Sequence, residues 1–260
     1  MKVNIITILW GKKYSESDVN RLFSMITRNT TFDVNFYLFS NNSLIDLDEG
    51  VIQKPEPANN SHVYSDSLNY RKEAGLCDDQ LGGLSGERVF FFDLDVLITG
   101  NLDELFDYPE ADNFYIINDW NTRGNEVGQA TCYSFVVGKL GQVKDYFEAN
   151  SENVINNFGT ASQEYLSDQI QKLFGSLHFW PEEWFKSFKF HCLPAWYLRR
   201  FIVPAKPPAR TKVLAFHGHP DIEDALLGRW APEGLKKSAR GWKKIYKQCR
   251  KTDWIEKFSE

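Results

Sequence analysis

Two aspartates at the end of an apolar run carry the clearest chemical signal in this sequence. Val89 to Phe92 leads into Asp93-Leu94-Asp95, and the chain becomes apolar again at Val96 to Ile98. A continuous apolar run of this length predicts a strand buried on both faces, with Asp93 and Asp95 pointing the same way. Neighbouring carboxylates at the end of a buried strand repel each other and resist the loss of water. A divalent cation would relieve both costs, so the segment predicts a metal site and phosphate chemistry.

The Asp-x-Asp motif is weak by itself, and the chain contains its own control. Asp46-Leu47-Asp48 repeats the motif, but Asn41-Asn42-Ser43 precedes it and Glu49-Gly50 follows it. Such polar surroundings are typical of a solvated loop. The apolar run before Asp93 is therefore what distinguishes the second copy.

A third ligand is predicted much later in the chain. His217 follows the short apolar run Val213 to Phe216, which we expect to be a strand. Mg²⁺ and Mn²⁺ bind oxygen ligands, and Mn²⁺ also accepts imidazole. Asp93, Asp95 and His217 together therefore predict a site for Mn²⁺ or Mg²⁺.

Composition excludes several classes of protein. The chain has 260 residues and a net charge of −5, which argues against a general nucleic-acid binder. Its opening apolar run, Val3 to Leu9, is too short for a signal peptide or a membrane span. The four cysteines have no metal-type spacing, so we expect free thiols and a cytoplasmic protein.

The first forty residues predict a β-α-β unit. Val3–Leu9 and Asp33–Phe39 have the pattern of strands, and Ser15–Arg28 has apolar residues at helical spacing. This order implies a parallel pair of strands, and ligands bind at the carboxyl ends of such strands. Further strands are predicted at Phe114–Ile117, Thr131–Val137 and Val213–Phe216, and helices at Ser65–Cys77, Gln142–Ala149 and Ser162–Phe174.

These patterns predict a single α/β domain over residues 1–260, ending in a basic amphipathic helical tail at 235–258. Between Lys236 and Lys251 there are eight Lys or Arg residues and no acid, and Trp242, Ile245, Tyr246 and Cys249 share one helical face. The tail would either pack that face on the core or lie peripherally on the inner surface of a membrane.

Three segments, in their order and spacing, resemble a GT-A fold glycosyltransferase. The resemblance is greatest to the family-8 (glycogenin- and galactosyltransferase-like) group and its bacterial relatives. It covers Val3 to about Ala225, and its three segments are Leu9–Tyr14 with Val19–Leu22, Arg88–Phe106, and Phe216–Pro220. The resemblance implies the nucleotide-diphospho-sugar transferase fold, a Rossmann-like mixed sheet flanked by helices.

The same resemblance implies a function. A sugar would move, with retention, from a UDP-sugar to an unknown glycan, lipid-linked or protein acceptor. The metal would neutralise the diphosphate leaving group as a Lewis acid and template. Asp93 would touch the ribose or the metal, and Asp95 and His217 would bind the metal. The candidate donor-binding residues are Thr7, Trp10, Gly11, Tyr14, Lys72, Asp93 and Leu94.

Three further residues are candidates for catalysis. Asp168 and Gln169 resemble the Asp-Gln that the family places under the anomeric carbon, where Asp168 would hold sugar hydroxyls. Gln169 would stabilise positive charge developing on the ring. Asp119, next to Trp120 after a predicted strand, is a candidate for sugar or acceptor binding, or for the general base of an inverting enzyme.

The sequence also departs from the family pattern. Where the family's His loop carries a lysine, this chain has Asp221, Glu223 and Asp224, so the diphosphate contacts are left open. Basic residues that could supply them are Arg199, Arg200, Lys206 and Arg210. Cys132-Tyr133-Ser134 replaces an Asn-Ser or Asn-Ala turn, which leaves the sugar open as well.

Two other functions are compatible with these residues. Phe92-Asp93-Leu94-Asp95 resembles the nucleophile motif of haloacid-dehalogenase-type phosphohydrolases, but that motif lies on the first strand, and here a β-α-β unit precedes it. The departures above would also fit a non-catalytic sugar- or nucleotide-binding protein on a degenerate transferase fold. A test for turnover would separate such a binding protein from an active glycosyltransferase.

Overall fold

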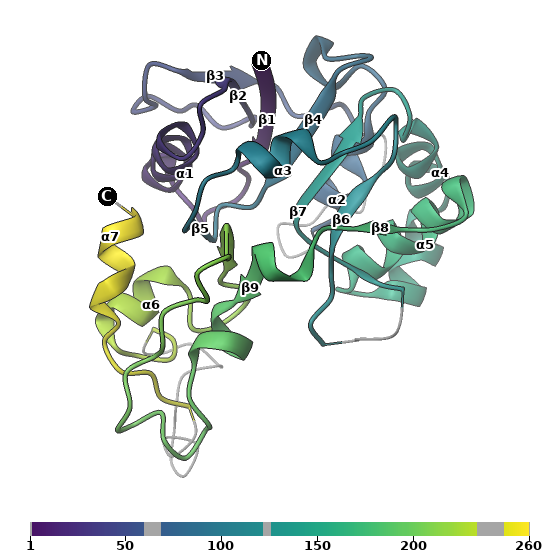
Figure 1. Cartoon of the computed structure of the whole chain (residues 1–260). Coiled ribbons are helices and arrows are strands. Elements are labelled where there is room, and N and C mark those ends of the chain that lie inside the picture. The colour runs from purple at the N-terminus through teal and green to yellow at the C-terminus, as the bar shows by residue number, and fades with distance from the viewer. Residues whose placement is uncertain (1, 60–68, 122–125, 233–246, 260) are drawn as a thin grey trace. The chain divides into compact units, whose positions relative to one another are not determined.

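The opening β-α-β unit forms as its apolar spacing predicts. Strand β1 (Lys2–Ile8), helix α1 (Glu16–Arg28) and strand β2 (Asp33–Phe39) follow one another, and β1 and β2 pair in parallel (Figure 1). The Asp18 carboxylate accepts a hydrogen bond from the Ser15 backbone amide, which satisfies a donor at the start of α1. The apolar positions of α1 are buried, so tertiary packing stabilises this helix.

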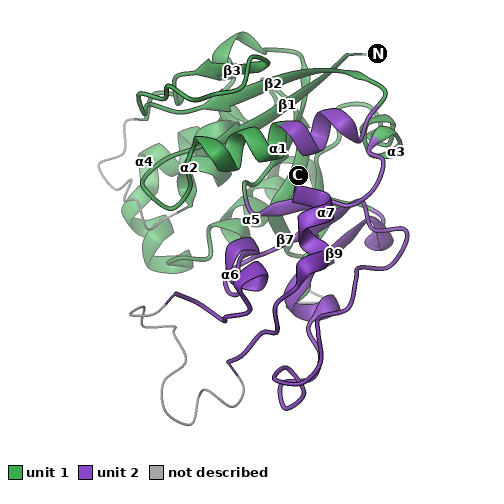
Figure 2. Cartoon of the chain, turned by 90° about the vertical axis from the view of Figure 1, so that its left-hand side faces the viewer, with its two compact units in different colours: residues 1–23, 31–94, 103–180 green, residues 24–30, 95–102, 181–260 purple. Residues whose placement is uncertain are grey.

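The computed structural model describes residues 2–59, 69–121, 126–232 and 247–259. The chain divides into two compact units (Figure 2). Unit 1 comprises residues 1–23, 31–94 and 103–180, and unit 2 comprises residues 24–30, 95–102 and 181–260.

Unit 1 is built on a seven-stranded mixed sheet of order β3-β2-β1-β4-β7-β6-β8. Strands β2, β1 and β4 run parallel to one another, whereas β7 is antiparallel to both β4 and β6. Because β1 and β4 are parallel neighbours, their carboxyl ends lie at the same edge of the sheet. The remaining strands of this sheet are β3 (Val51–Lys54), β4 (Arg88–Phe92), β6 (Tyr115–Asn118), β7 (Gly128–Val136) and β8 (His178–Phe179).

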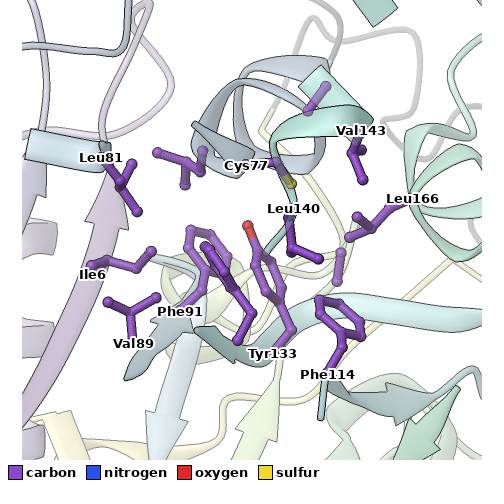
Figure 3. Close-up of a cluster of buried hydrophobic side chains, with 14 of the residues drawn as sticks. Ile6, Cys77, Leu81, Val89, Phe91, Phe114, Tyr133, Leu140, Val143 and Leu166 are labelled. Atoms are coloured by element: carbon purple, nitrogen blue, oxygen red, sulfur yellow. The ribbon is translucent and has the colours of Figure 1, made fainter. Parts of the chain in front are cut away.

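Helices pack on this sheet around an aromatic core. They are α2 (Tyr70–Glu73), α3 (Asp103–Asp107), α4 (Gly141–Phe158) and α5 (Ser162–Phe174). Figure 3 shows Phe91 of β4 beside Tyr133 of β7, and their rings stack at 4.6 Å. The Tyr133 hydroxyl donates to the Lys72 carbonyl at 2.7 Å. This bond connects α2 to the middle of the sheet.

Unit 2 contains a smaller sheet of three strands. Strand β10 (Val213–Ala215) lies between β5 (Val96–Ile98) and β9 (Phe185–Ser187), antiparallel to the first and parallel to the second. Stacked Phe188 and Phe216 rings, 4.6 Å apart, pack beside this sheet. Short helices α6 (Ile222–Leu227) and α7 (Glu256–Ser259) complete the unit.

Strand alternation, from which Asp93 and Asp95 were predicted to point the same way, does not apply to them, because neither residue lies on a strand. Strand β4 ends at Phe92, residues 93–95 form a turn, and β5 joins the other sheet. The last ladder bond of this stretch runs from the Asp93 amide to the Thr131 carbonyl at 2.9 Å. Asp95 remains buried in this turn, at 7% exposed, whereas Asp93 is partly exposed.

The predicted helix Ser65–Cys77 is only partly within the described residues, since 65–68 lie outside them. Residues 70–77 form α2 and a 3₁₀ turn at Gly75–Cys77 in place of a longer helix. Conversely, α4 extends well beyond the predicted Ala149, through a non-helical Asn150. The predicted tail helix lies mostly outside the described residues, and residues 247–252 are not helical.

All four cysteines are buried and free, as expected from their spacing. Among the described residues, none of the helices combines the length and apolar character needed to cross a membrane.

Candidate functional site

The strongest contact among the predicted residues of unit 1 joins Lys72 to Asp93. The Lys72 ammonium lies 2.5 Å from Oδ2 of Asp93, which directly follows β4. The other carboxylate oxygen of Asp93 accepts from the Leu94 amide at 3.2 Å. Lys72 is buried, with 6% of its surface exposed. A lysine is rarely buried without an acidic partner, so this pair is built into the fold.

A second carboxylate accompanies this pair and was not predicted. Glu73 is buried, and its Oε1 lies 3.6 Å from the Lys72 ammonium, while its Oε2 has no hydrogen-bond partner among the described residues. Burial raises the pKa of the Glu73 carboxyl to about 7, against the lowering effects of the Lys72 ammonium and of a hydrogen bond with Ser162. The helical pattern of this segment gave no signal for the burial of Glu73.

The predicted donor-binding residues around the end of β1 have different environments. The Thr7 hydroxyl is buried and donates to the Phe92 carbonyl at 2.8 Å, which joins β1 to the end of β4. Trp10 is half-buried and packs against the core, and Gly11 has a φ of 65° that favours glycine. The Tyr14 hydroxyl contacts the Lys13 ammonium. Thr7 therefore fixes the strand ends, whereas Trp10 and Tyr14 are the partly exposed aromatic side chains nearby.

Two of the three predicted metal ligands belong to unit 2. Asp95 precedes β5 and His217 follows β10 closely, and these strands pair with Ala215 opposite Val96. The Phe216 amide donates to the Asp95 carbonyl at 2.9 Å, which extends that ladder by one step. His217 is thus the next residue after the backbone partner of Asp95. Its Nε2 lies 2.7 Å from the Ser187 hydroxyl.

A separate His-Asp group in unit 2 also has the composition of a cation site. One ligand atom from each of His219, Asp221 and Asp224 lies within 4.8 Å of the others. Asp224 is fully buried, and its two oxygens meet Arg229 Nε at 2.7 Å and His219 Nδ1 at 3.2 Å. Asp221 caps α6 by accepting from the Asp224 amide at 2.8 Å. These contacts fix the Asp224 carboxylate and the start of α6 in place.

The predicted catalytic pair lies on α5 in unit 1. The Asp168 carboxylate accepts from Gln169 Nε2 at 2.9 Å and lies 2.5 Å from the Lys172 ammonium one turn later. Gln169 is 7% exposed. The neighbouring Ser167 hydroxyl accepts from the Gly128 amide at 2.9 Å, which fixes this part of α5 to the start of β7.

Asp119 is buried directly after β6. Its Oδ2 accepts from the Asn121 amide at 3.2 Å, and its own amide donates to the Val127 carbonyl at 3.1 Å. These contacts form a local turn at the strand end. Asp119 therefore has a structural role in this turn.

The described structure brings the predicted residues together in groups. Within unit 1, Thr7 and Asp93 flank the joined ends of β1 and β4, and Lys72 reaches Asp93. Asp168 and Gln169 contact each other on α5. Within unit 2, Asp95 and His217 lie one ladder step apart.

Comparison with known proteins gives structural matches but no match by sequence. No protein-family model matches the chain, and no curated protein matches it. The solved structures that it is similar to include the apo form of the glycosyltransferase GlyE of Streptococcus pneumoniae TIGR4, with a TM-score of 0.58 and 12% identity. That match covers 95% of this chain and 59% of the GlyE chain, so this chain spans less than two thirds of it.

The galactosyltransferase LgtC is a second structural neighbour, and its match covers nearly all of both chains. LgtC in complex with donor and acceptor sugar analogues matches with a TM-score of 0.56 and 12% identity, over 99% of this chain and 95% of that one. The LgtC active-site mutant, in which a glutamine is replaced by glutamate, matches at 0.55 and 11% identity, over 94% of each chain. With the seven-stranded mixed sheet flanked by helices, these neighbours show that the chain has the GT-A fold.

Proposed function

We propose that this protein is a glycosyltransferase that moves a sugar from a nucleotide-diphosphate donor, a UDP-sugar, to a glycan acceptor with retention of configuration. The observation that carries the proposal is the buried contact between Lys72 and Asp93 at the carboxyl ends of β1 and β4. That edge is where ligands bind in open α/β sheets. The sequence predicts both residues as donor contacts, and their proximity supports that prediction.

The Lys72–Asp93 pair gives the donor end both charge and hydrogen-bond acceptors. The Lys72 ammonium has three donors, so beside its contact with Asp93 it can also meet an anionic group. The Asp93 carboxylate can accept from a ribose hydroxyl. Trp10 and Tyr14 offer partly exposed aromatic faces on which a base could stack.

Asp93, Asp95 and His217 make a donor set that suits Mn²⁺, because carboxylate oxygen and imidazole nitrogen are both ligands of that ion. The Phe216 amide donates to the Asp95 carbonyl, so the backbone of His217 lies next to that of Asp95. When bound, the metal would neutralise the diphosphate leaving group. Mg²⁺ is the alternative cation.

Gln169 and Asp168 are the residues that we assign to the sugar. The LgtC mutant replaces an active-site glutamine, which supports a glutamine at the reacting centre of this fold. The contact with Asp168 uses the amide nitrogen of Gln169 and leaves its amide oxygen to other partners. That oxygen can face positive charge developing on the sugar ring, while Asp168 accepts from sugar hydroxyls.

The phosphohydrolase alternative gains no support. Asp93 follows β4, after a complete β-α-β unit, and the structural neighbours are glycosyltransferases. The non-catalytic alternative differs from the proposal only in turnover. LgtC was solved with donor and acceptor sugar analogues, and a glycan acceptor for this chain is inferred from that complex.

Release of UDP from a panel of UDP-sugars tests the proposed activity. We expect slow hydrolysis that requires Mn²⁺ or Mg²⁺ and is lost in Asp93→Asn. Nitrophenyl phosphate serves as the control substrate. Its hydrolysis by the wild type, lost in Asp93→Asn, would favour the phosphohydrolase, and nucleotide-sugar binding without any UDP release would favour the binding protein.

A further inference from the structure

Unit 2 exposes an unusual concentration of large apolar side chains in one short loop, residues 195–203. Five of the twelve exposed large apolar residues in the described part of the chain lie there, with exposed fractions of 47–71%. They are Trp196, Tyr197, Phe201, Ile202 and Val203. Single exposed apolar residues are ordinary, but a cluster of this kind marks an interaction surface.

The 195–203 loop has a fixed base. The Ala205 amide donates to the Cys192 carbonyl at 2.9 Å, and the Trp254 indole donates to the Pro204 carbonyl at 2.9 Å. Two turns shape the loop itself, where the Leu198 amide donates to the Ala195 carbonyl and the Phe201 amide donates to the Leu198 carbonyl, both at 2.8 Å. The loop is therefore a defined projection that presents its apolar side chains.

Arg199 provides an internal contrast within the same loop. Its Nε donates to the Pro194 carbonyl at 3.2 Å, and its guanidinium lies 5.2 Å from the centre of the Trp230 ring. The basic side chain is thus held against the protein. The neighbouring Trp196 and Tyr197 rings contact each other edge to face at 5.6 Å and are more than half exposed. These exposed apolar side chains are therefore available to a partner.

The charge around the loop indicates which kind of partner it binds. Residues 184–220 contain seven Lys or Arg and no Asp or Glu, but Lys186 and Arg210 pair with Glu182 and Glu183, and Lys212 is buried. Arg200 and Lys206, at the loop and just after it, are both exposed. This surface is complementary to an anionic partner. A second copy of the chain docking by the same surface would bring like charges together.

We propose that the 195–203 loop docks on an anionic lipid bilayer. Trp and Tyr prefer the boundary between headgroups and acyl chains, and Phe and Ile add apolar area below it. Arg and Lys next to such a loop are attracted to anionic headgroups. A neutral glycan could stack on the aromatic rings, but it would give no reason for the exposed cations Arg200 and Lys206 beside them.

Co-sedimentation with vesicles tests this proposal without any nucleotide sugar, so it stands or fails apart from the proposed activity. We expect the wild type to bind vesicles of phosphatidylcholine with phosphatidylglycerol, to bind phosphatidylcholine alone weakly, and to dissociate as salt rises. Arg200→Glu should weaken binding roughly tenfold or more, because each basic residue near such a surface contributes about a fivefold factor. The double variant Trp196→Ser with Phe201→Ser should lose binding to both kinds of vesicle.

Matched controls separate the loop from general effects. Ile45→Ser removes an 87% exposed apolar residue from unit 1, and Lys257→Glu makes the same charge change on α7, so both should bind as the wild type does. Near-ultraviolet circular dichroism checks folding of every variant. The proposal is overturned if the wild type stays in the supernatant, if the loop variants bind normally, or if sedimentation velocity shows a wild-type dimer that the loop variants lose.

Discussion

The Lys72 ammonium lies 2.5 Å from the Asp93 carboxylate and 3.6 Å from the Glu73 carboxylate, with all three side chains largely buried. The Lys72 ammonium therefore lies close to two largely buried carboxylates. Removing the Lys72 ammonium would leave both carboxylates without a compensating charge.

Removing Lys72 should lower the stability of the fold. Lys72→Met keeps the volume but leaves two buried carboxylates without their cation, so we expect a loss of about 3 kcal/mol in the free energy of unfolding. Urea unfolding measures it. Lys172→Met is the matched control, because Lys172 also lies 2.5 Å from an aspartate but is 61% exposed, and should cost less than about 1 kcal/mol. Equal losses in the two variants would contradict the buried role of Lys72.

Glu73 predicts a pH dependence of stability with a definite sign. Burial raises the pKa of its carboxyl in the folded state from 4.5 to about 7. The folded state therefore binds the proton more tightly, and the free energy of unfolding falls as pH rises between those values. Glu73→Gln should remove this slope and be more stable than the wild type at pH 8 by up to about 3 kcal/mol. Thermal unfolding from pH 4 to pH 8 measures the effect, and identical slopes in both proteins would refute it.

Gln169 should act on the reaction rather than on folding. Gln169→Ala removes the amide proposed to face the developing charge, so kcat for UDP release should fall by about 10²–10³. Gln171→Ala is the control, since Gln171 lies on the same helix and donates to the Glu126 carbonyl at 2.7 Å. Steady-state kinetics on both variants should separate them. A common loss of activity would indicate that α5 was disturbed as a whole.

The His219 group should stabilise unit 2 without binding the metal. Asp224→Asn removes the charge of a buried carboxylate that contacts the 37% exposed Arg229 guanidinium, and we expect a loss of about 1–2 kcal/mol in the free energy of unfolding. Its affinity for Mn²⁺, measured by titration calorimetry below the unfolding temperature, should stay at the wild-type value. A loss of Mn²⁺ binding with retained folding would move the metal site to this group.

Much of the fold could be predicted because local pattern and tertiary burial agree. The strand Asp33–Phe39 and the helix Ser162–Phe174 were predicted with the bounds observed, and the mixed α/β fold was confirmed. The turn at residues 93–95 could not be predicted in this way. Apolar runs precede and follow it, and periodicity does not reveal that the second run enters another sheet.

The candidate site was predictable in its residue types but not in all of its environments. Lys72 was predicted to contact the donor, but its spacing did not indicate that it is buried beside Glu73. No spacing rule shows that three of the four residues of α2, Tyr70, Lys72 and Glu73, are buried. The roles of Asp93, Asp95 and His217 as metal ligands stay predictions, because only the chemistry of their side chains indicates a metal.

Thermal shift with nucleotide sugars, with and without Mn²⁺, tests the central claim most directly. The wild type should be stabilised by a UDP-sugar in the presence of Mn²⁺, more than by either component alone. Asp95→Ala should lose this joint stabilisation when each shift is measured from the variant's own melting temperature without ligand. A donor-induced shift that is the same without Mn²⁺, or that persists in Asp95→Ala, would contradict the account.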